Sequence, residues 1–271
     1  MPLPMPANEN DFNMATALGW CVAHELPAEK LTVHSLWLPT VAQVRNPRLL
    51  HSATGAIQTL GGNLLPDCKI ADLITDGRRV LAAQSGAHQY QADAFVLATG
   101  AWAGLSLGQP AAIPNIRPVR GQMLLYAPGS HQLGHILYRD GVYLVPRRDG
   151  HLLVGSSVED AGFDAATSDE VLRRLQQSAC ALLPELQAHS PIQSWAGLRP
   201  GSPDNIPLID RHPDFDNLWI HTGHFRYGVT MAPASSRLLV ELILGEAPSL
   251  DPAPYSWGAA QDRRWPEGKP C

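Results

Sequence analysis

Apolar residues recur three and four positions apart in four stretches of the chain, and this spacing predicts amphipathic helices. The four stretches cover residues 11–25, 46–60, 167–183 and 232–244. Asn46 is a good N-cap for the second helix, and the pair Gly61-Gly62 is expected to end it. Thr167 and Glu170 have the spacing of a capping box at the start of the third.

Short strands are predicted between the helices from runs of β-branched, aromatic and other apolar residues. They cover residues 63–65, 71–75, 80–84, 117–126, 136–138, 142–145, 152–155 and 217–221, and one further strand leads to residue 199. The turn pairs Asp76-Gly77, Asp140-Gly141 and Asp149-Gly150 predict antiparallel connections. The four strands between residues 117 and 155 are therefore expected to form an antiparallel meander.

The segment from Asp93 to Trp102 differs from the other strands, because its apolar residues do not alternate with polar ones. An unbroken apolar run that ends at a glycine, here Gly100, is typical of a strand buried on both faces in a parallel sheet. The carboxyl ends of such strands open onto a ligand crevice. A strand in the core of a β-sandwich would show the same run, and periodicity alone does not separate the two.

Arg199 lies at an apolar strand end, beside Leu198 and close to Trp195, and a rigid turn follows from Pro200. A guanidinium in such surroundings loses hydration and needs an anion or several acceptors for its planar set of donors. A carboxylate accepts two parallel hydrogen bonds from these donors. Arg199 is therefore a candidate to bind a carboxylate. The competing interpretation is an ion pair with a neighbour such as Asp204.

A glycine-bounded loop, Gly223 to Thr230, leads into the fourth predicted helix. Such a loop presents unpaired backbone N–H groups and the positive end of the helix dipole, which suit an anion or a polarised carbonyl. His221 and His224 lie close together in the sequence, but no third ligand stands at metal-site spacing, which argues against a metal site.

Composition and charge exclude several classes of function. A net charge of −5, mixed along 271 residues, gives no electrostatic basis for binding nucleic acid or an anionic membrane. The four cysteines are far apart and show no ligand spacing, which predicts a reduced, cytoplasmic setting. The apolar run at residues 238–244 is too short to span a bilayer, and residues 1–6 lack the features of a secretory signal.

Seven segments between about residues 36 and 245 carry a resemblance to a known family. In chain order they are Val44 to Pro47, Val96 to Trp102, Pro118 to Met123, Tyr143 to Arg147, Gly155 to Glu159, Gly197 to Pro200 and Gly223 to Gly228. Together they resemble the FAD-dependent D-amino-acid oxidase superfamily, and most closely its glycine oxidase branch, which is associated with thiamine biosynthesis. The resemblance implies a mixed α/β fold, with an incomplete FAD-binding Rossmann-like domain and an antiparallel-sheet substrate domain.

The resemblance also implies roles for the matched residues. Arg199 would bind the substrate carboxylate, Tyr143 would donate its hydroxyl to the same group, and Arg226 would lie at the inner end of the site. The expected cofactor-binding residues are Gly100, Ala101, Trp102, Gly223, Phe225, Tyr227, Gly228, Val229 and Thr230. Tyr143 has a competing interpretation as a half-buried strand tyrosine. Three other arginines are expected to be solvated or paired rather than to bind ligands: Arg120, Arg147 and Arg148.

The implied chemistry is oxidation of a small amine by FAD. Glycine or a similar short amino acid would pass hydride from its α-carbon to the flavin, water would hydrolyse the imine to an oxo acid and ammonia, and oxygen would give hydrogen peroxide. Alternatives within this chemistry are a sarcosine oxidase, a D-amino-acid dehydrogenase, and an opine or cyanogenic amine oxidase. An alternative of another class is a non-catalytic remnant, or a subunit that needs a partner.

The sequence departs from the superfamily because it contains no G-x-G-x-x-G turn, the motif that receives the FAD pyrophosphate. Residues 36–110 and 195–246 are interpreted as the remnant of the FAD-binding domain. The other expected units are a lead-in with a helix at 1–35, the substrate domain at 111–194 and a flexible tail at 247–271.

A truncated gene model, a fragment, or a partner chain that supplies the missing segment would each account for this departure, and a homo-oligomer is a further expectation. In each case the strands at residues 94–98 and 217–221 would lose neighbours and expose apolar faces and backbone groups. The isolated chain is therefore expected to bind FAD weakly and to aggregate.

Overall fold

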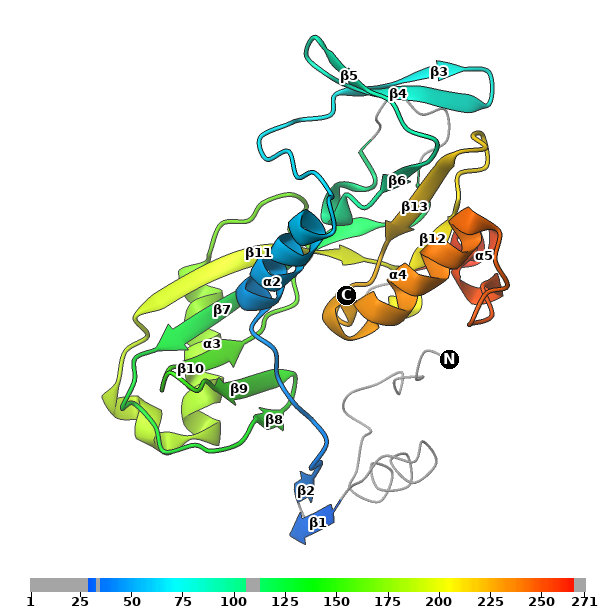
Figure 1. The fold of residues 1–271 in the computed structure, drawn as a ribbon. Helices are drawn as coiled ribbons and strands as arrows, with labels where there is room; N and C mark the ends of the chain where they lie inside the picture. The colour runs from blue at the N-terminus through cyan, green and yellow to red at the C-terminus, as the bar shows by residue number, and fades with distance from the viewer. Residues whose placement is uncertain (1–28, 33–34, 106–112, 266–271) are drawn as a thin grey trace.

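The computed structural model describes residues 29–32, 35–105 and 113–265. The helix predicted at residues 11–25 lies outside them. Within the described residues the strands form four sheets, and the helices pack mainly against two of them, the five-stranded sheet and the three-stranded sheet that contains β6 (Figure 1).

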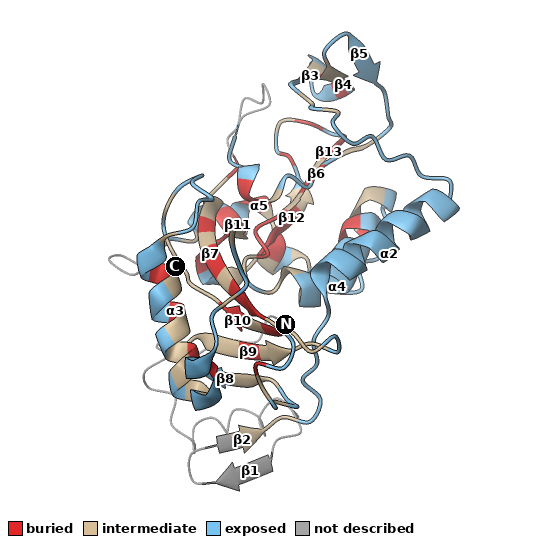
Figure 2. Cartoon of the chain, turned by 90° about the vertical axis from the view of Figure 1, so that its left-hand side faces the viewer, coloured by how far each residue is buried: buried red, intermediate tan, exposed pale blue. Residues whose placement is uncertain are grey.

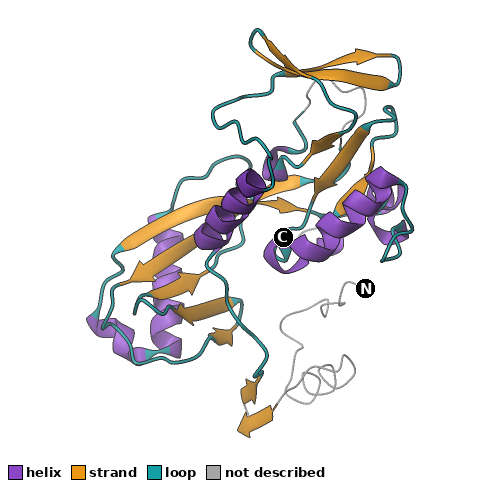
Figure 3. Ribbon diagram, in the orientation of Figure 1, coloured by secondary structure: helices purple, strands orange, loops and turns teal. Residues whose placement is uncertain are grey.

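The five-stranded sheet is antiparallel and has the strand order β11-β7-β10-β9-β8. Its strands are β7 (Arg117–Tyr126), β8 (Leu137–Arg139), β9 (Val142–Pro146), β10 (Leu152–Gly155) and β11 (Gln193–Gly201). The turn after Asp140 joins β8 to β9, and the turn around Asp149 joins β9 to β10. The meander predicted from these turn residues is confirmed (Figure 3).

Helix α3 (Asp169–Leu182) covers one face of this sheet (Figure 3). Side chains of the helix and of that face form one buried apolar cluster, to which Leu124, Tyr126, Leu144, Leu152, Val154, Val171, Leu175, Ala179 and Leu186 belong. The predicted capping box does not form, because Ser168 rather than Thr167 is the N-cap and its side chain accepts no cap hydrogen bond. Instead the Ser168 backbone N–H donates to Gln122 Oε1, at 2.8 Å.

The three-stranded sheet has the order β12-β13-β6 and combines β6 (Phe95–Leu97), β12 (Leu208–Arg211) and β13 (Leu218–Thr222). β6 is parallel to β13, which favours the parallel-sheet interpretation of this apolar run over the sandwich. β13 has a neighbour on each side, so the expected loss of neighbours is wrong for that strand. β6 is an edge strand among the described residues, and its Val96 is 42% exposed.

The C-terminal region packs against the three-stranded sheet, contrary to the flexible tail expected after Ala247. Helix α4 (Gly228–Leu244) ends at Gly245, which has a positive φ, and α5 (Trp257–Asp262) follows. Tyr255 and Trp257 are buried, and the Trp257 backbone N–H donates to Asp210 of β12 at 2.8 Å. Because proline, glycine and charged residues dominate this segment, the sequence analysis did not predict that Tyr255 and Trp257 would be buried.

Helix α2 (Asn46–Thr59) forms where it was predicted, but none of its residues is buried (Figure 2). Its N-cap is Arg45 rather than Asn46, which is the first helical residue. The apolar residues of the helix face solvent, with Leu50 67% exposed and the C-cap Leu60 87% exposed. The amphipathic pattern therefore predicted the helix correctly, but no described residues cover its apolar face.

Two small sheets complete the described chain. β1 (Glu29–Thr32) pairs with β2 (Ser35–Trp37), and a second sheet joins β3 (Asp72–Asp76), β4 (Arg79–Ser85) and β5 (His88–Tyr90). The strand predicted at residues 63–65 does not form. In the described part of the chain, no helix combines the length and the apolar character needed to cross a bilayer.

Two histidines join β13 to α4. His221 and His224 both lie within hydrogen-bond distance of the Ser235 hydroxyl, at 3.2 and 3.1 Å, and their ring centroids are 4.6 Å apart. Burial lowers the pKa of both, and the nearby His221 contributes to a His224 pKa of about 4. Both rings are therefore neutral at neutral pH, and Ser235 can donate to one ring and accept from the other.

Acid is expected to destabilise the fold through His224. Its pKa is about 4 in the folded chain against 6.5 ordinarily, so the unfolded state binds more protons between these values. Above pH 6.5 His224 is neutral in both the folded and the unfolded chain, so it does not change the free energy of unfolding. As the pH falls toward 4, protonation of the unfolded chain lowers the free energy of unfolding, by about 2–3 kcal/mol at pH 4.5. Urea unfolding at pH 7.5 and 4.5 measures this loss. His224→Gln should show less of it, and an equal loss in both proteins contradicts the assignment.

Candidate active site

Arg199 lies on the face of the five-stranded sheet opposite to α3. In the register between β11 and β7, Arg199 is paired with Val119, and Gly197 with Gly121. Paired side chains share a face and alternate along each strand, so Arg199 lies on the side that Leu124 and the α3 cluster do not occupy. A row on the same face crosses four strands and consists of Trp195, Met123, Gly155 and Tyr143.

Two glycines make room for this arrangement. A Cβ atom at Gly121 would collide with the guanidinium of Arg199, which lies across the β7 backbone. A Cβ atom at Gly155 would collide with Met123 Sδ and lie 2.9 Å from the Tyr143 hydroxyl. Glycine weakens a strand interior, but here it allows an arginine on β11 and a tyrosine on β9 to approach each other across the two strands between them.

The hydrogen-bond partners of Arg199 are neutral. Its Nη2 donates to Ser156 Oγ at 2.7 Å, and its Nη1 donates to the Ser157 carbonyl at 3.2 Å. The alternative partner, Asp204, instead acts electrostatically on Arg263, whose pKa it raises against the larger effect of burial. The hydrogen bonds of Arg199 therefore leave its charge without a directly bonded carboxylate, which is the condition for binding an anionic ligand.

Tyr143 and Arg226 both act on the Arg199 charge. Burial lowers the pKa of the Arg199 guanidinium, the interaction with the Tyr143 hydroxyl opposes that change, and the positive charge of Arg226 adds to it. The Tyr143 hydroxyl also lies 3.5 Å from Met123 Sδ. The structure thus brings together the three residues expected from the sequence at the substrate end of the site, but Arg226 is exposed rather than at the inner end.

The loop at residues 223–227 is fixed to the end of β11. The Phe225 backbone N–H donates to the Pro200 carbonyl at 3.0 Å, and the Ser202 hydroxyl donates to the Gly223 carbonyl at 2.6 Å. Because Pro200 follows Arg199 and Phe225 precedes Arg226, the first of these bonds places the backbones of the two arginines side by side. Gly223 has a φ of +81°, and a Cβ atom there would collide with Ile116.

Glu159 lies at the centre of a polar network behind Arg199. Its carboxylate accepts hydrogen bonds from Ser157, Gln122 and Arg120, and Arg120 also pairs with Asp164 at 2.6 Å. Desolvation raises the pKa of Glu159, but these hydrogen bonds together outweigh it and lower the pKa. The expectation that Arg120 is paired rather than a ligand is confirmed.

Two other arginines lie away from this network. Arg147 is partly buried, which lowers its pKa, and Arg45 lowers it further, whereas Asp149 opposes the change. Asp149 pairs directly with Arg45 at 3.0 Å. Arg148 is exposed, as expected for a solvated residue.

The expected cofactor-binding residues lie where β6 and β13 end. Gly100 to Trp102 form a short 3-10 helix after β6, and the Thr222 hydroxyl at the end of β13 donates to the Gly100 carbonyl at 3.1 Å. Ala101 is buried, whereas Trp102 is 52% exposed and stacks on Phe163 with ring centroids 6.3 Å apart. The parallel strand ends thus bring this segment beside the Gly223 loop.

The loop at residues 223–230 is shorter than expected. Gly228, Val229 and Thr230 form the first turn of α4, with Tyr227 as N-cap, and Pro233 lies inside the helix rather than at its start. The first N–H groups of a helix have no partner within the helix, and at this end of α4 they suit an anionic or polar edge of a ring. These residues fit the ring end of a flavin. For its pyrophosphate, the sequence has no G-x-G-x-x-G turn.

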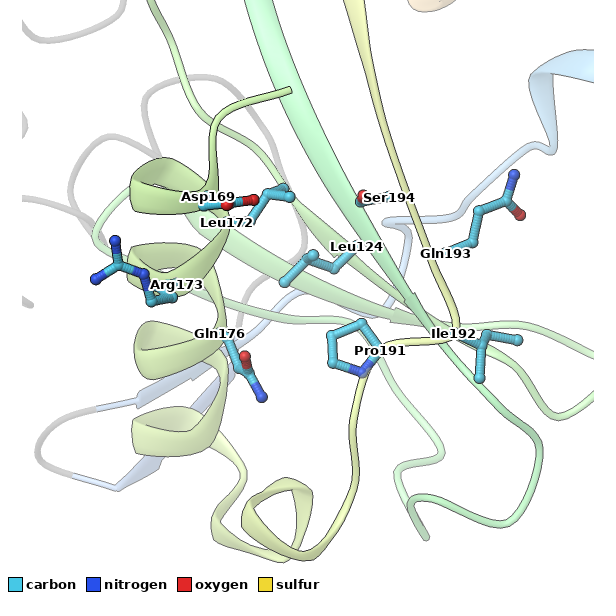
Figure 4. A pocket seen from close by; sticks show the side chains of 9 residues that line it. All are labelled: Leu124, Asp169, Leu172, Arg173, Gln176, Pro191, Ile192, Gln193 and Ser194. Atoms are coloured by element: carbon cyan, nitrogen blue, oxygen red, sulfur yellow. The ribbon is translucent and has the colours of Figure 1, made fainter. Parts of the chain in front are cut away.

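A separate hollow of about 530 Å³ lies between α3 and strands β7 and β11 (Figure 4). Leu124, Arg173 and Ile192 are among its lining residues, and Arg199, Tyr143 and Arg226 are not. It therefore belongs to the α3 side of the sheet. Among the described residues, no group of three or more histidine, cysteine or acidic side chains is arranged to hold a metal ion.

Sequence reasoning missed four residues that shape the site: Gly121, Ser156, Ser157 and Glu159. All four stand in segments that carried the resemblance, Pro118 to Met123 and Gly155 to Glu159. Their place in these two segments was the only sign in the sequence that they belong to the site. Their roles depend on contacts between β7, β10 and β11, which the sequence does not show.

Comparison with known proteins places the chain in a family. The model of the family described as "FAD dependent oxidoreductase" matches residues 17–242. The chain is 39% identical to a glycine oxidase of Pseudomonas aeruginosa over 256 residues, which cover 89% of this chain and 70% of that protein. It is 34% identical to the bifunctional protein ThiO/ThiG of Trichormus variabilis over 212 residues, which cover 77% of this chain and 32% of that protein.

The fold agrees with this match. The crystal structure of glycine oxidase from Geobacillus kaustophilus superposes with a TM-score of 0.80 at 24% identity, covering 88% of this chain and 69% of that one. The resemblance inferred from seven short segments is therefore confirmed, as is the mixed α/β fold with its antiparallel sheet. The chain belongs to the family of FAD-dependent oxidoreductases.

Proposed function

We propose that the chain takes part in the FAD-dependent oxidation of the amine of glycine or a similarly small amino acid. The observation that carries the proposal is the Arg199 guanidinium, which is desolvated, bonded to neutral partners and accompanied by Tyr143 and Arg226. The names of the relatives, glycine oxidase and ThiO/ThiG, support an amino acid as the substrate and a connection with thiamine biosynthesis.

The carboxylate of the substrate would bind between Arg199 and Tyr143. Arg199 would give two parallel hydrogen bonds, for which its planar donors are suited, and the Tyr143 hydroxyl would add a third. Arg226 would supply a second positive charge at the exposed side of the same position. With the carboxylate fixed in this way, the α-carbon has a defined orientation, which is the main contribution that a binding site makes to such a step.

The remaining residues would hold and orient the cofactor. Gly100 to Trp102 and the loop from Gly223 to Tyr227 would border the ring of FAD, and the first turn of α4, with Val229 and Thr230, would donate to its polar edge. When bound, FAD supplies the capacity to accept hydride from a carbon beside an amine and to pass the electrons to oxygen. No side chain has to act as an acid or base if the amine binds uncharged.

A second candidate function is a substrate-binding subunit without turnover of its own. The exposed apolar residues of α2 and the open edge of β6 favour it, since both are surfaces that another structural unit would cover. In that case a βαβ unit carrying the G-x-G-x-x-G turn would have to join this chain before FAD binds tightly. Sarcosine and D-alanine are alternative substrates of the same chemistry.

Removal of Arg199 tests the proposal. Arg199→Ala should weaken acetate binding, followed by NMR titration, by at least about 30-fold, since a charge-assisted pair contributes about 2–3 kcal/mol. Tyr143→Phe should cost less, because it removes one neutral donor. Exposed Arg148→Ala is the matched control and should bind like the wild type. Equal acetate binding by Arg199→Ala and the wild type would contradict the proposal that Arg199 binds a carboxylate.

Peroxide release separates the two candidate functions. With a saturating concentration of FAD, the oxidase function predicts hydrogen peroxide from glycine, and a ranking of glycine, sarcosine and D-alanine identifies the preferred amine. A chain that binds acetate through Arg199 and releases no peroxide from any of the three supports the substrate-binding subunit instead.

FAD affinity tests the interpretation of the missing motif. Without a G-x-G-x-x-G turn to receive the pyrophosphate, the 271-residue chain is expected to purify without stoichiometric flavin and to associate through its exposed apolar residues. Absorbance of the purified protein and its size in solution measure both. A yellow, monomeric protein with one flavin per chain would overturn this expectation.

A further inference from the structure

We propose that Glu159 is a positioning residue for Arg199 and acts through the segment Ser156-Ser157. The inference rests on the proposed function, because it concerns the arginine that would bind the substrate carboxylate. Glu159 does not hydrogen-bond to Arg199 itself, because its carboxylate oxygens accept from Ser157, Gln122 and Arg120.

The segment Ser156-Ser157 is the direct support of the guanidinium. It provides two hydrogen-bond acceptors for Arg199, the Ser156 hydroxyl and the Ser157 carbonyl, and it follows immediately after β10 ends at Gly155. Gly121 supplies the flat surface on which the guanidinium lies but donates nothing to it. The direction of the Arg199 donors therefore depends on where this two-residue segment is held.

Glu159 holds that segment in place. Its Oε1 accepts from the Ser157 hydroxyl at 2.5 Å, and its two carboxylate oxygens accept from Gln122 Nε2 at 3.0 and 3.1 Å. Arg120 donates to Oε2 from Nε at 3.2 Å and from Nη2 at 2.8 Å. A backbone bridge of 2.9 and 3.0 Å between Arg120 and Glu159 ties the same segment to β7.

The Ser157 hydroxyl has no capacity to compensate for a change at Glu159. It already accepts the Gln122 backbone N–H at 2.8 Å, and it donates its single proton to Glu159. Gln122 is fully buried, and its own Oε1 accepts the N–H at the start of α3. Loss of the acceptor at Glu159 would leave buried donors unsatisfied, so the segment is expected to shift rather than to stay in place.

Charge and position make opposite predictions for this residue. The negative charge of Glu159 favours the cationic form of Arg199 and repels an incoming carboxylate. If Glu159 acted through its charge alone, Glu159→Gln would strengthen the binding of a carboxylate. If it acts by position, the same variant weakens that binding, because the guanidinium loses its fixed direction.

The experiment compares Glu159→Gln with Asp164→Asn in the full chain. Asp164 pairs with the same Arg120 but is exposed and does not contact Ser157, so its variant is a matched loss of one charge. The first measurement follows rotation of the Arg199 guanidinium by NMR with ¹⁵N-labelled arginine, assigned through Arg199→Lys. Separate Nη signals are expected in the wild type and in Asp164→Asn, and averaged signals in Glu159→Gln.

The second measurement is the affinity for acetate. Glu159→Gln should weaken it by about tenfold, the effect of leaving one or two buried donors unpaired, and Asp164→Asn should leave it unchanged. Ser157→Ala removes only the hydroxyl link and should weaken binding in the same direction, which keeps the test valid if Glu159→Gln does not fold. Unchanged or tighter binding, with unchanged guanidinium rotation, would overturn the positioning role.

The two proposals fail in different ways. If acetate does not bind the wild type, or binds without Arg199, the proposed function fails, and the guanidinium rotation alone still decides whether Glu159 positions Arg199. If acetate binds through Arg199 but neither Glu159→Gln nor Ser157→Ala alters binding or rotation, only the positioning role fails.

Discussion

The proposed site depends on one partly buried guanidinium whose hydrogen bonds go to neutral groups. An arginine in this state is costly unless a further acceptor or an anion completes its interactions. Arg199 has a serine hydroxyl and a carbonyl on one side, a tyrosine beside it and a second arginine nearby. A small carboxylate would complete these interactions, and this is the basis of the proposal that the substrate is an amino acid.

Two features of the fold leave room for the Arg199 guanidinium: glycines on β7 and β10, and the register of the sheet. Gly121 and Gly155 remove side chains from the paths of Arg199 and Tyr143, and the register of the sheet aligns them on one face. The bond from Phe225 to Pro200 joins that sheet to the loop of Arg226. The residues proposed for the substrate and those proposed for the cofactor are thus connected through the last residues of β11.

The sequence predicted elements better than it predicted their surroundings. Strands β7, β9 and β10 followed from short apolar runs and turn residues, because these signals are local. The start of α4 was misplaced, since Pro233 suits a first turn but here lies inside the helix. The aromatic anchors after Ala247 were missed because proline, glycine and charge dominate that segment.

The site shows the same division. Arg199, Tyr143 and Arg226 were identified through motifs, and the structure brings them together. Glu159 and Ser157 stood in a matched motif without a role, because a network that runs from Arg120 to Arg199 depends on pairing between strands far apart in sequence. The exposure of α2 was also not predicted. Its apolar face is typical of a helix that packs against another layer, but no described residues cover it.

The most direct measurement of the central claim is a crystal structure of the protein with glycine bound. The account predicts that the glycine carboxylate accepts hydrogen bonds from the Arg199 guanidinium and the Tyr143 hydroxyl, with its α-carbon toward the Gly100 and Gly223 segments. A glycine bound elsewhere, or an Arg199 side chain turned away from its carboxylate, would contradict it.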